Sequence, residues 1–291
     1  MLRSLADATA ARHGVPADRV TPVPGGVANH AFALGDDLFL RIPRDAASAT
    51  DLRKEAAVIP AARRTGVRTA GVVEFTESDP PRMLLERVPG AGLESVPLSG
   101  PRRAGVLRAL GHDLALLHAA PPPAGLPYDD GGDPHGIVGH LARRGSVDPA
   151  TAAWLTACFT RLDRLAPASP PCLLHGDVAP QNVLVGEAEE FAALVDWGDA
   201  CRGEPAMEFA KLDLTDVVPA LEGYGAPGLA PRILRHHLSW ALVAAMRPPV
   251  TGQRHWTAPP LSRLLRVLRV LRFLASSPPE PWGSLARELR A

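Results

Sequence analysis

The segments LLHGDVAPQNVLV (residues 173–185) and LVDWGD (residues 194–199) decide the fold that we predict for this chain. Two short apolar runs of strand character bracket a polar turn in the first segment, and a third apolar run precedes the acidic end of the second. The order is His-Gly-Asp, four residues, Asn, an apolar strand and then Asp-Trp-Gly. This order predicts that Asp177, Asn182 and Asp196 face one cleft.

Two carboxylates and an amide in this order provide the groups that phosphoryl transfer requires. The protein must orient an attacking hydroxyl and hold magnesium against the nucleotide phosphates. We expect Asp177 to accept the hydroxyl proton, and Asn182 and Asp196 to bind Mg²⁺ through oxygen. Each residue alone would be typical of a turn or a strand end, but the combined spacing favours catalysis. His175 is expected to brace the loop and not to act as a base.

The flanking sequence divides into a strand-rich and a helix-rich part. Residues 20–43 read as strand, turn and strand, residues 46–64 as a helix that Pro60 should kink or end, and residues 72–75 and 82–88 as two more strands. Beyond Gly90 the pattern is helical. The expected helices span residues 101–118, 149–165, 231–246 and 261–275, and residues 119–136 are expected to form a loop.

Over nearly its whole length the chain resembles the aminoglycoside phosphotransferase family, which has a protein-kinase-like fold and is related to choline and fructosamine kinases. The residues that carry this resemblance are above all 173–199, with weaker support from residues 25–29, 38–43, 83–90 and 111–118. It implies an α+β, two-lobed protein-kinase-like fold with a small antiparallel sheet in the N-lobe and a mostly helical C-lobe. The expected N-lobe is residues 1–88, the hinge about residues 86–90, and the C-lobe residues 91–291.

The resemblance also implies that ATP or GTP binds between the lobes with Mg²⁺. The phosphates would lie under the turn at residues 25–29, the base would bond to the backbone near residues 86–88, and the acceptor would lie against the C-lobe. Within that lobe we expect the acceptor near Asp199, because this carboxylate follows Asp196 so closely. The nucleotide-binding residues expected on this basis are Gly25, Gly26, Asn29, Arg41, Glu55, Glu86 and Val88.

Arg41 departs from the family pattern, because the third strand usually carries a lysine at this position. Arginine keeps a permanent positive charge and could pair with Glu55, although its planar fork differs from an ammonium. The alternative interpretation is a surface arginine in Arg-Ile-Pro-Arg. The spacing of Glu208, Lys211 and Asp213 is likewise what a solvated helix face would show.

The composition excludes several classes of function. Basic and acidic residues both number 31, so no overall field favours nucleic acid. The three cysteines lack a C-x-x-C pair, which indicates buried free thiols. With no apolar run of membrane-spanning length, we expect a cytoplasmic protein without a membrane partner, as a monomer or a homodimer.

The acceptor is expected to be a small hydroxylated molecule. An antibiotic or secondary metabolite, and hence a role in antibiotic resistance, is what the family resemblance implies. A metabolic kinase acting on choline, an amino alcohol or a sugar would use the same motifs. A nucleotide-binding pseudokinase is a further alternative that Arg41 suggests and that the intact Asp177, Asn182 and Asp196 oppose. The absence of Ala-Pro-Glu and of an activation segment disfavours a protein substrate.

Overall fold

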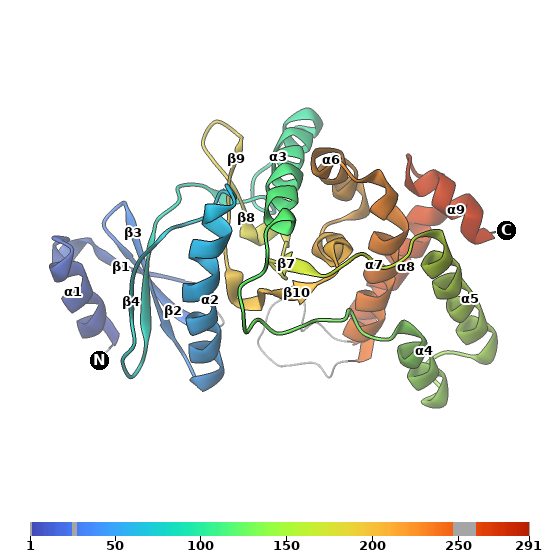
Figure 1. Ribbon diagram of the computed structural model, residues 1–291, viewed down its shortest axis with the longest axis horizontal. Coiled ribbons are helices and arrows are strands. Elements are labelled where there is room, and N and C mark those ends of the chain that lie inside the picture. Colours follow the sequence, from blue (N-terminus) through green and yellow to red (C-terminus); the bar gives the residue numbers. More distant parts are fainter. Residues whose placement is uncertain (1, 25–27, 247–259, 291) are drawn as a thin grey trace.

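The computed structural model describes residues 2–24, 28–246 and 260–290, except for the side chains of residues 244, 245 and 260–266. The chain folds into a small lobe built on an antiparallel sheet and a larger, mostly helical lobe (Figure 1). The expected two-lobed fold is therefore confirmed. Gly25 and Gly26 lie outside the described residues. No helix in the described part of the chain is long and apolar enough to cross a membrane.

The small lobe contains a five-stranded antiparallel sheet between two helices. Its strand order is β1-β2-β3-β5-β4. The strands are β1 (Val20–Val23), β2 (Asn29–Leu34), β3 (Leu38–Pro43), β4 (Val72–Thr76) and β5 (Arg82–Glu86), and the helices are α1 (Leu2–Arg12) and α2 (Ala46–Arg64). Figure 1 shows α1 on the outer side of the sheet and α2 on the side that faces the large lobe.

Alternation along the strands explains why both faces of this sheet are covered. Successive side chains of a strand point to opposite faces. On β5, Leu84 belongs to the apolar cluster under α1, whereas Met83 and Leu85 belong to the cluster under α2. The same alternation on β3 brings Leu40 to the α1 side and leaves Arg41 on the α2 side, where the site forms.

Helix α2 begins at a capped position and continues further than its proline suggests. The side chain of Asp45 accepts a hydrogen bond from the backbone N–H of Ser48, which satisfies one free donor of the first turn. The helix includes Pro60 and ends at Arg64, the predicted bound, so of the two expected effects of Pro60, a kink or an end, the end does not occur. Buried residues on both sides of the proline, Ile59 and Ala62, hold the last turn against the core.

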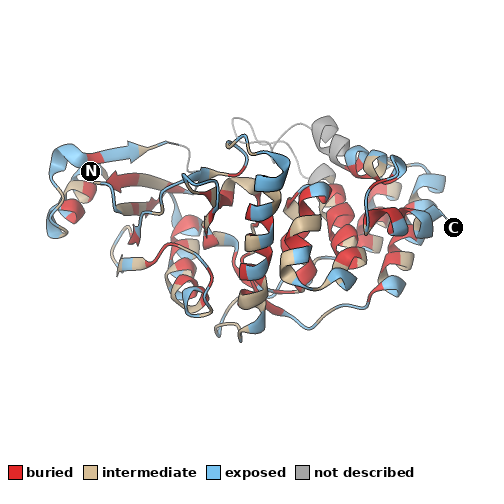
Figure 2. Ribbon diagram, turned by 90° about the horizontal axis from the view of Figure 1, so that it is seen from above, coloured by how far each residue is buried: buried red, intermediate tan, exposed pale blue. Residues whose placement is uncertain are grey.

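The large lobe combines short strands with seven described helices. Strands β6 (Ala91–Gly92), β8 (Val183–Val185) and β9 (Phe191–Leu194) form one sheet, and β7 (Cys172–Leu174) pairs with β10 (Cys201–Gly203). The helices are α3 (Gly100–Ala119), α4 (Pro134–Arg143), α5 (Pro149–Leu165), α6 (Leu214–Tyr224), α7 (Ala230–Met246), α8 (Pro260–Ala275) and α9 (Trp282–Arg290). Figure 2 shows their buried residues turned inward and their exposed residues turned outward.

Helices α3 and α6 cross at backbone contact in the centre of this lobe. A Cβ atom on Gly111 would lie 1.8 Å from the carbonyl oxygen of Ala220, and one on Gly223 would lie 2.0 Å from that of Arg108. Any side chain at either glycine would separate the helices. Two glycines therefore set the distance between these helices.

The loop between α2 and β4 ties the small lobe to the large one. The guanidinium of Arg68 makes a two-point contact with the Asp113 carboxylate of α3, at 3.0 and 2.7 Å. The backbone carbonyl of Arg68 accepts a hydrogen bond from the Leu194 N–H at 2.9 Å. Asp113 is only 2% exposed, so this two-point ion pair fixes the loop to a buried carboxylate of α3.

Cys158, Cys172 and Cys201 are buried free thiols, as expected.

Candidate active site

The loop from β7 to β8 carries the first group of site residues. It turns at Gly176, whose φ of +81° and whose missing Cβ, 2.2 Å from the carbonyl oxygen of Asp199, both require glycine. Asp177 follows directly, with 22% of its side chain exposed. The side-chain amide of Asn182 donates to the backbone oxygen of Asp177 at 2.9 Å and to its Oδ2 at 2.8 Å. Both amide hydrogens are thereby used, and the amide oxygen of Asn182 is the atom left to bind a cation.

His175 holds this loop against the end of β9. Its Nδ1 accepts a hydrogen bond from the Asp177 N–H at 3.2 Å, which makes Nε2 the donor to the Val195 carbonyl at 3.1 Å. Its ring packs edge-on against Trp197, with the ring centroids 4.6 Å apart. Complete burial lowers the pKa of His175, so the ring is neutral and occupied on both nitrogens. Its position suits bracing and leaves no nitrogen for an acceptor.

Arg41 joins the two lobes at the second carboxylate. Its Nη1 donates to Glu55 on α2, and its Nη2 donates to Oδ1 of Asp196 at 3.0 Å. The Arg41 side chain is only 12% exposed, so the surface-arginine interpretation is wrong. Burial acts to lower the pKa of Arg41, but Glu55 and Asp196 outweigh it and raise that pKa. Burial raises the pKa of Glu55 to about 7, against the opposing effect of Arg41.

Asp196 adopts a backbone conformation that is rare outside glycine. Its φ and ψ are 71° and 74°, in the left-handed region, and such strain is often found at functional sites. About half of its side chain, 52%, is exposed. The next residue, Trp197, is buried and donates from its ring nitrogen to Oγ1 of Thr69 at 2.9 Å. The strained turn is thus fixed by a bond to the loop that precedes β4.

The sequence interpretation missed two residues that bind the β7–β8 loop at residues 175–177. Glu208 and Lys211 belong to a 3₁₀ helix, η4 (Pro205–Lys211), and not to a solvated face. Glu208 is 2% exposed and accepts the backbone N–H groups of His175 and Gly176 at 2.9 and 2.8 Å. The ammonium of Lys211 contacts Oδ1 of Asp177 at 2.6 Å. No pattern in the sequence marked either residue, because two charges within the five residues EFAKL also suit a solvated face.

Asp199 lies at the open side of this cluster. Its side chain is 66% exposed, and its Oδ2 is 3.7 Å from Nζ of Lys211. Partial removal of water raises the pKa of Asp199; Lys211 opposes this rise, and Asp177 and Asp196 add to it. The described structure therefore brings together Arg41, Glu55, Asp177, Asn182, Asp196 and Asp199.

Comparison with known families identifies this arrangement. Residues 19–221, more than half of the chain, match the model of the phosphotransferase enzyme family. The chain belongs to this family. The sequence-based expectation of a small-molecule phosphotransferase is thereby confirmed. No curated protein is significantly similar to this phosphotransferase in sequence.

Solved structures share its fold at low sequence identity. The GDP complex of an aminoglycoside 2′-phosphotransferase-IIIa has a TM-score of 0.64 at 18% identity, over 93% of this chain and 90% of that one. A choline/ethanolamine kinase family protein from Mesorhizobium loti has a TM-score of 0.66 at 17% identity, over 99% and 98% of the two chains. A macrolide 2′-phosphotransferase from Brachybacterium faecium has a TM-score of 0.59 at 20% identity, over 98% and 96%.

The expected hinge of this phosphotransferase is partly occupied by internal bonds. The backbone N–H of Glu86 donates to Gly71, and that of Arg87 donates to Asp37, at 2.8 and 2.7 Å. The Glu86 carboxylate pairs with Arg63 at 2.5 Å, and the Arg63 side chain lowers the pKa of Glu86. Of the two hinge residues expected to contact the base, Glu86 therefore cannot offer its N–H group.

Asn29, another residue expected to bind the nucleotide, lies at the start of β2 and is 5% exposed. It lies opposite Pro43 of β3 in the sheet register.

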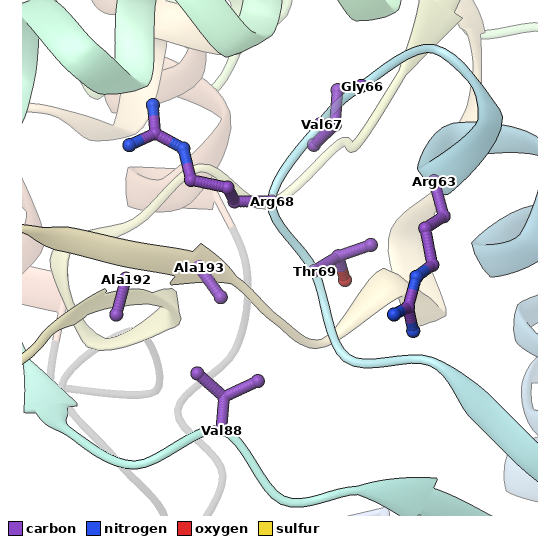
Figure 3. Close-up of a pocket in the computed structure, with 8 residues that line it drawn as sticks. All are labelled: Arg63, Gly66, Val67, Arg68, Thr69, Val88, Ala192 and Ala193. Atoms are coloured by element: carbon purple, nitrogen blue, oxygen red, sulfur yellow. The ribbon is translucent and has the colours of Figure 1, made fainter.

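Val88 lines a cavity of about 350 Å³ between the lobes. Figure 3 shows its side chain across from Thr69 and Ala193, while the Arg68 guanidinium turns away from it. The lining residues are Arg63, Gly66, Val67, Arg68, Thr69, Val88, Ala192 and Ala193. None of the acidic site residues is among them, so this cavity is separate from the carboxylate cluster.

The site of this phosphotransferase contains oxygen donors of the kind that binds Mg²⁺. Within the described residues, no group of three or more His, Cys, Asp or Glu is arranged to hold a metal ion. The amide oxygen of Asn182 and the carboxylate of Asp196 are hard oxygen donors. Mg²⁺ is usually held by one or two carboxylates together with nucleotide phosphates, so this small set is sufficient.

Proposed function

We propose that this phosphotransferase moves the γ-phosphoryl group of ATP or GTP to a hydroxyl of a small molecule, namely an antibiotic or a related secondary metabolite. The observation that carries the proposal is the Arg41 bridge from Glu55 to Asp196, next to an Asp177 carboxylate held by Asn182. These contacts bring the proposed base, the two proposed cation ligands and a fixed positive charge together.

In the proposed reaction, Asp177 removes the proton as the acceptor oxygen attacks the γ-phosphorus. The new oxygen–phosphorus bond forms while the bond to the bridging oxygen breaks, and the nucleoside diphosphate leaves. Asp177 keeps the proton until solvent removes it. Asn182 and Asp196 would hold Mg²⁺, which neutralises charge on the phosphates when bound. Arg41 adds a permanent positive charge on the N-lobe side.

Nucleotide binding is supported by the structural neighbours, which include complexes named for GDP and for ATP with streptomycin. The antibiotic class rests on the aminoglycoside and macrolide phosphotransferases among them. The choline/ethanolamine kinase family protein makes a metabolic acceptor the second candidate. Asp199 is the proposed contact for the acceptor, because its exposed carboxylate lies within 3.7 Å of the ammonium that binds Asp177.

The test is acceptor profiling with labelled ATP and GTP against hydroxylated antibiotics, choline, amino alcohols and sugars. We expect one antibiotic class to gain phosphate. Asp177→Ala should lower kcat by about 10²- to 10⁴-fold and leave nucleotide affinity nearly unchanged. Asp36→Asn, at a site 76% exposed in the small lobe, is the matched control and should have no effect. Nucleotide binding without turnover on any acceptor would refute the proposal in favour of a pseudokinase.

A further inference from the structure

Lys211 places a positive charge directly on the proposed base. Its Nζ lies 2.6 Å from Oδ1 of Asp177 and 3.0 Å from the backbone oxygen of Gly176. The same atom is 3.7 Å from Oδ2 of Asp199. An ammonium has three hydrogens, and this geometry directs two of them to the loop. The side chain is 24% exposed, so the contact is enclosed on most sides.

The geometry of η4 explains how the lysine reaches the loop. In a 3₁₀ helix, side chains three residues apart eclipse each other. Glu208 and Lys211 have this spacing, and both contact the same turn. Glu208 accepts its backbone N–H groups, whereas Lys211 donates to its carbonyl and carboxylate oxygens. One short helix thus binds the loop through donors and acceptors together.

The Asp177 carboxylate is held at both oxygens by different segments. Asn182, within the loop, donates to Oδ2 at 2.8 Å, and Lys211, from η4, donates to Oδ1. Either partner alone would leave the carboxylate free to rotate about its last bond. The two together fix the plane and the direction of the carboxylate. A base must lie within hydrogen-bond reach of the proton it removes, and small displacements are costly.

Composition supplies a second observation. The chain contains 29 arginines and only two lysines, Lys54 and Lys211. A compact ammonium can lie between a carbonyl and a carboxylate oxygen where a planar guanidinium has a different shape. Lys211 is therefore one of the few basic residues of this chain that is not arginine, and it lies at a narrow contact whose shape suits an ammonium.

We propose that Lys211 is a positioning residue for phosphoryl transfer, which fixes the orientation of Asp177 and separates its carboxylate from that of Asp199. This inference rests on the proposed function. In this role Lys211 exchanges no proton with the acceptor. Without Lys211, Asp177 keeps its hydrogen bonds to Asn182 and 22% of its side chain still reaches solvent, so the loss of Lys211 should affect turnover more than folding.

Lys211→Ala tests this role in the wild-type acceptor assay. We expect kcat to fall about 100-fold, as for a displaced base, with the nucleotide KM within twofold and the thermal midpoint nearly unchanged. Ethylammonium chloride should raise the kcat of Lys211→Ala at least tenfold, whereas sodium chloride at equal ionic strength should not raise it. Ethylammonium can occupy the space that the lysine side chain leaves. It restores the orientation of the Asp177 carboxylate only if the positive charge at that point is what the variant lacks.

Two further variants control the experiment. Lys211→Met keeps the length of the side chain without its charge, and it should lose as much kcat as Lys211→Ala and show no rescue. Arg108→Ala removes an exposed ion pair with Glu222, in which both side chains are about half exposed, and it should leave kcat unchanged. If either lysine variant unfolds, the other provides the measurement.

The outcomes separate this inference from the function on which it rests. An active wild type with a Lys211→Ala kcat within threefold of it would overturn the positioning role alone. A low kcat without ethylammonium rescue, accompanied by a lowered thermal midpoint, would also overturn it and indicate a structural role. A wild type that phosphorylates no acceptor would overturn the proposed function and this inference with it.

Discussion

Replacement of Glu208 by glutamine is the most direct test of how the catalytic loop is held. Glu208 is buried, and its two oxygens accept the N–H groups of His175 and Gly176 separately. Burial acts to raise the pKa of Glu208, but His118 of α3 above all, together with the Gly176 N–H, outweighs it, and the pKa falls below its ordinary value. The carboxylate is therefore charged. Glutamine keeps the shape but turns one acceptor into a donor.

The expected cost follows from the contacts that are lost. A hydrogen bond to a charged group is worth about 1.5–3 kcal/mol, and a buried donor without an acceptor costs about 1–3 kcal/mol. Glutamine can retain one of the two backbone bonds and leaves the other N–H facing its own NH₂ group. We therefore expect a loss of about 2–4 kcal/mol of folding free energy. Because His175 and Gly176 precede Asp177, kcat should fall about 100-fold as well.

Urea unfolding and steady-state kinetics measure the two effects in the same preparation. Glu222→Gln is the matched control, because the Glu222 side chain is 51% exposed in a surface pair with Arg108. Its loss should stay below about 0.5 kcal/mol. A Glu208→Gln variant as stable and as active as this control would show that the carboxylate does not support the loop.

Three further changes test other parts of the structure. Arg41→Lys keeps the charge but not the two separate nitrogens that bond to Glu55 and Asp196, so kcat/KM for the nucleotide should fall about tenfold. Arg41→Met also removes the charge and should lose far more kcat/KM. Equal losses in the two variants would refute the bridging role. Burial acts to raise the pKa of Glu204, but His236 and Arg232 outweigh it and lower that pKa to about 2, so its stabilisation is complete above pH 4.5 and lost as the pH falls towards 2. On acidification the thermal midpoint should therefore fall less in Glu204→Gln than in the wild type. The difference corresponds to about 2–3 kcal/mol of unfolding free energy, and identical acid profiles would contradict it. Gly111→Ala should cost about 1–3 kcal/mol in urea unfolding because α3 and α6 must separate, whereas Gly105→Ala in the same helix has open space and should not destabilise; equal effects would contradict the close crossing.

The sequence predicted the elements that local patterns determine. Helices α2 and α5 have the predicted bounds, and α3, α7 and α8 agree within one residue at each end. Helices α1, α4, α6 and α9 were not predicted, and α4 begins at Pro134 inside the expected loop. Apolar periodicity identifies long helices that face one core, whereas a short helix such as α4 depends on contacts from distant segments.

The site shows the same division between local and distant information. Asp177, Asn182 and Asp196 were found because their spacing is local to one turn and one strand. Lys211 was missed because its partner is 34 residues away, and Glu208 because a charged residue gives no sign of burial in a single sequence. Their roles in catalysis remain predictions that the variants above will test.

The Arg68 contacts have a mechanical consequence. Arg68 is bonded to α3 and β9 of the large lobe although it precedes the last strands of the small one. The small lobe is therefore held to the large one at this loop and at the Arg41–Asp196 pair, as well as through the chain at residues 87–90. Any change in the angle between the lobes must lengthen or break at least one of these bonds.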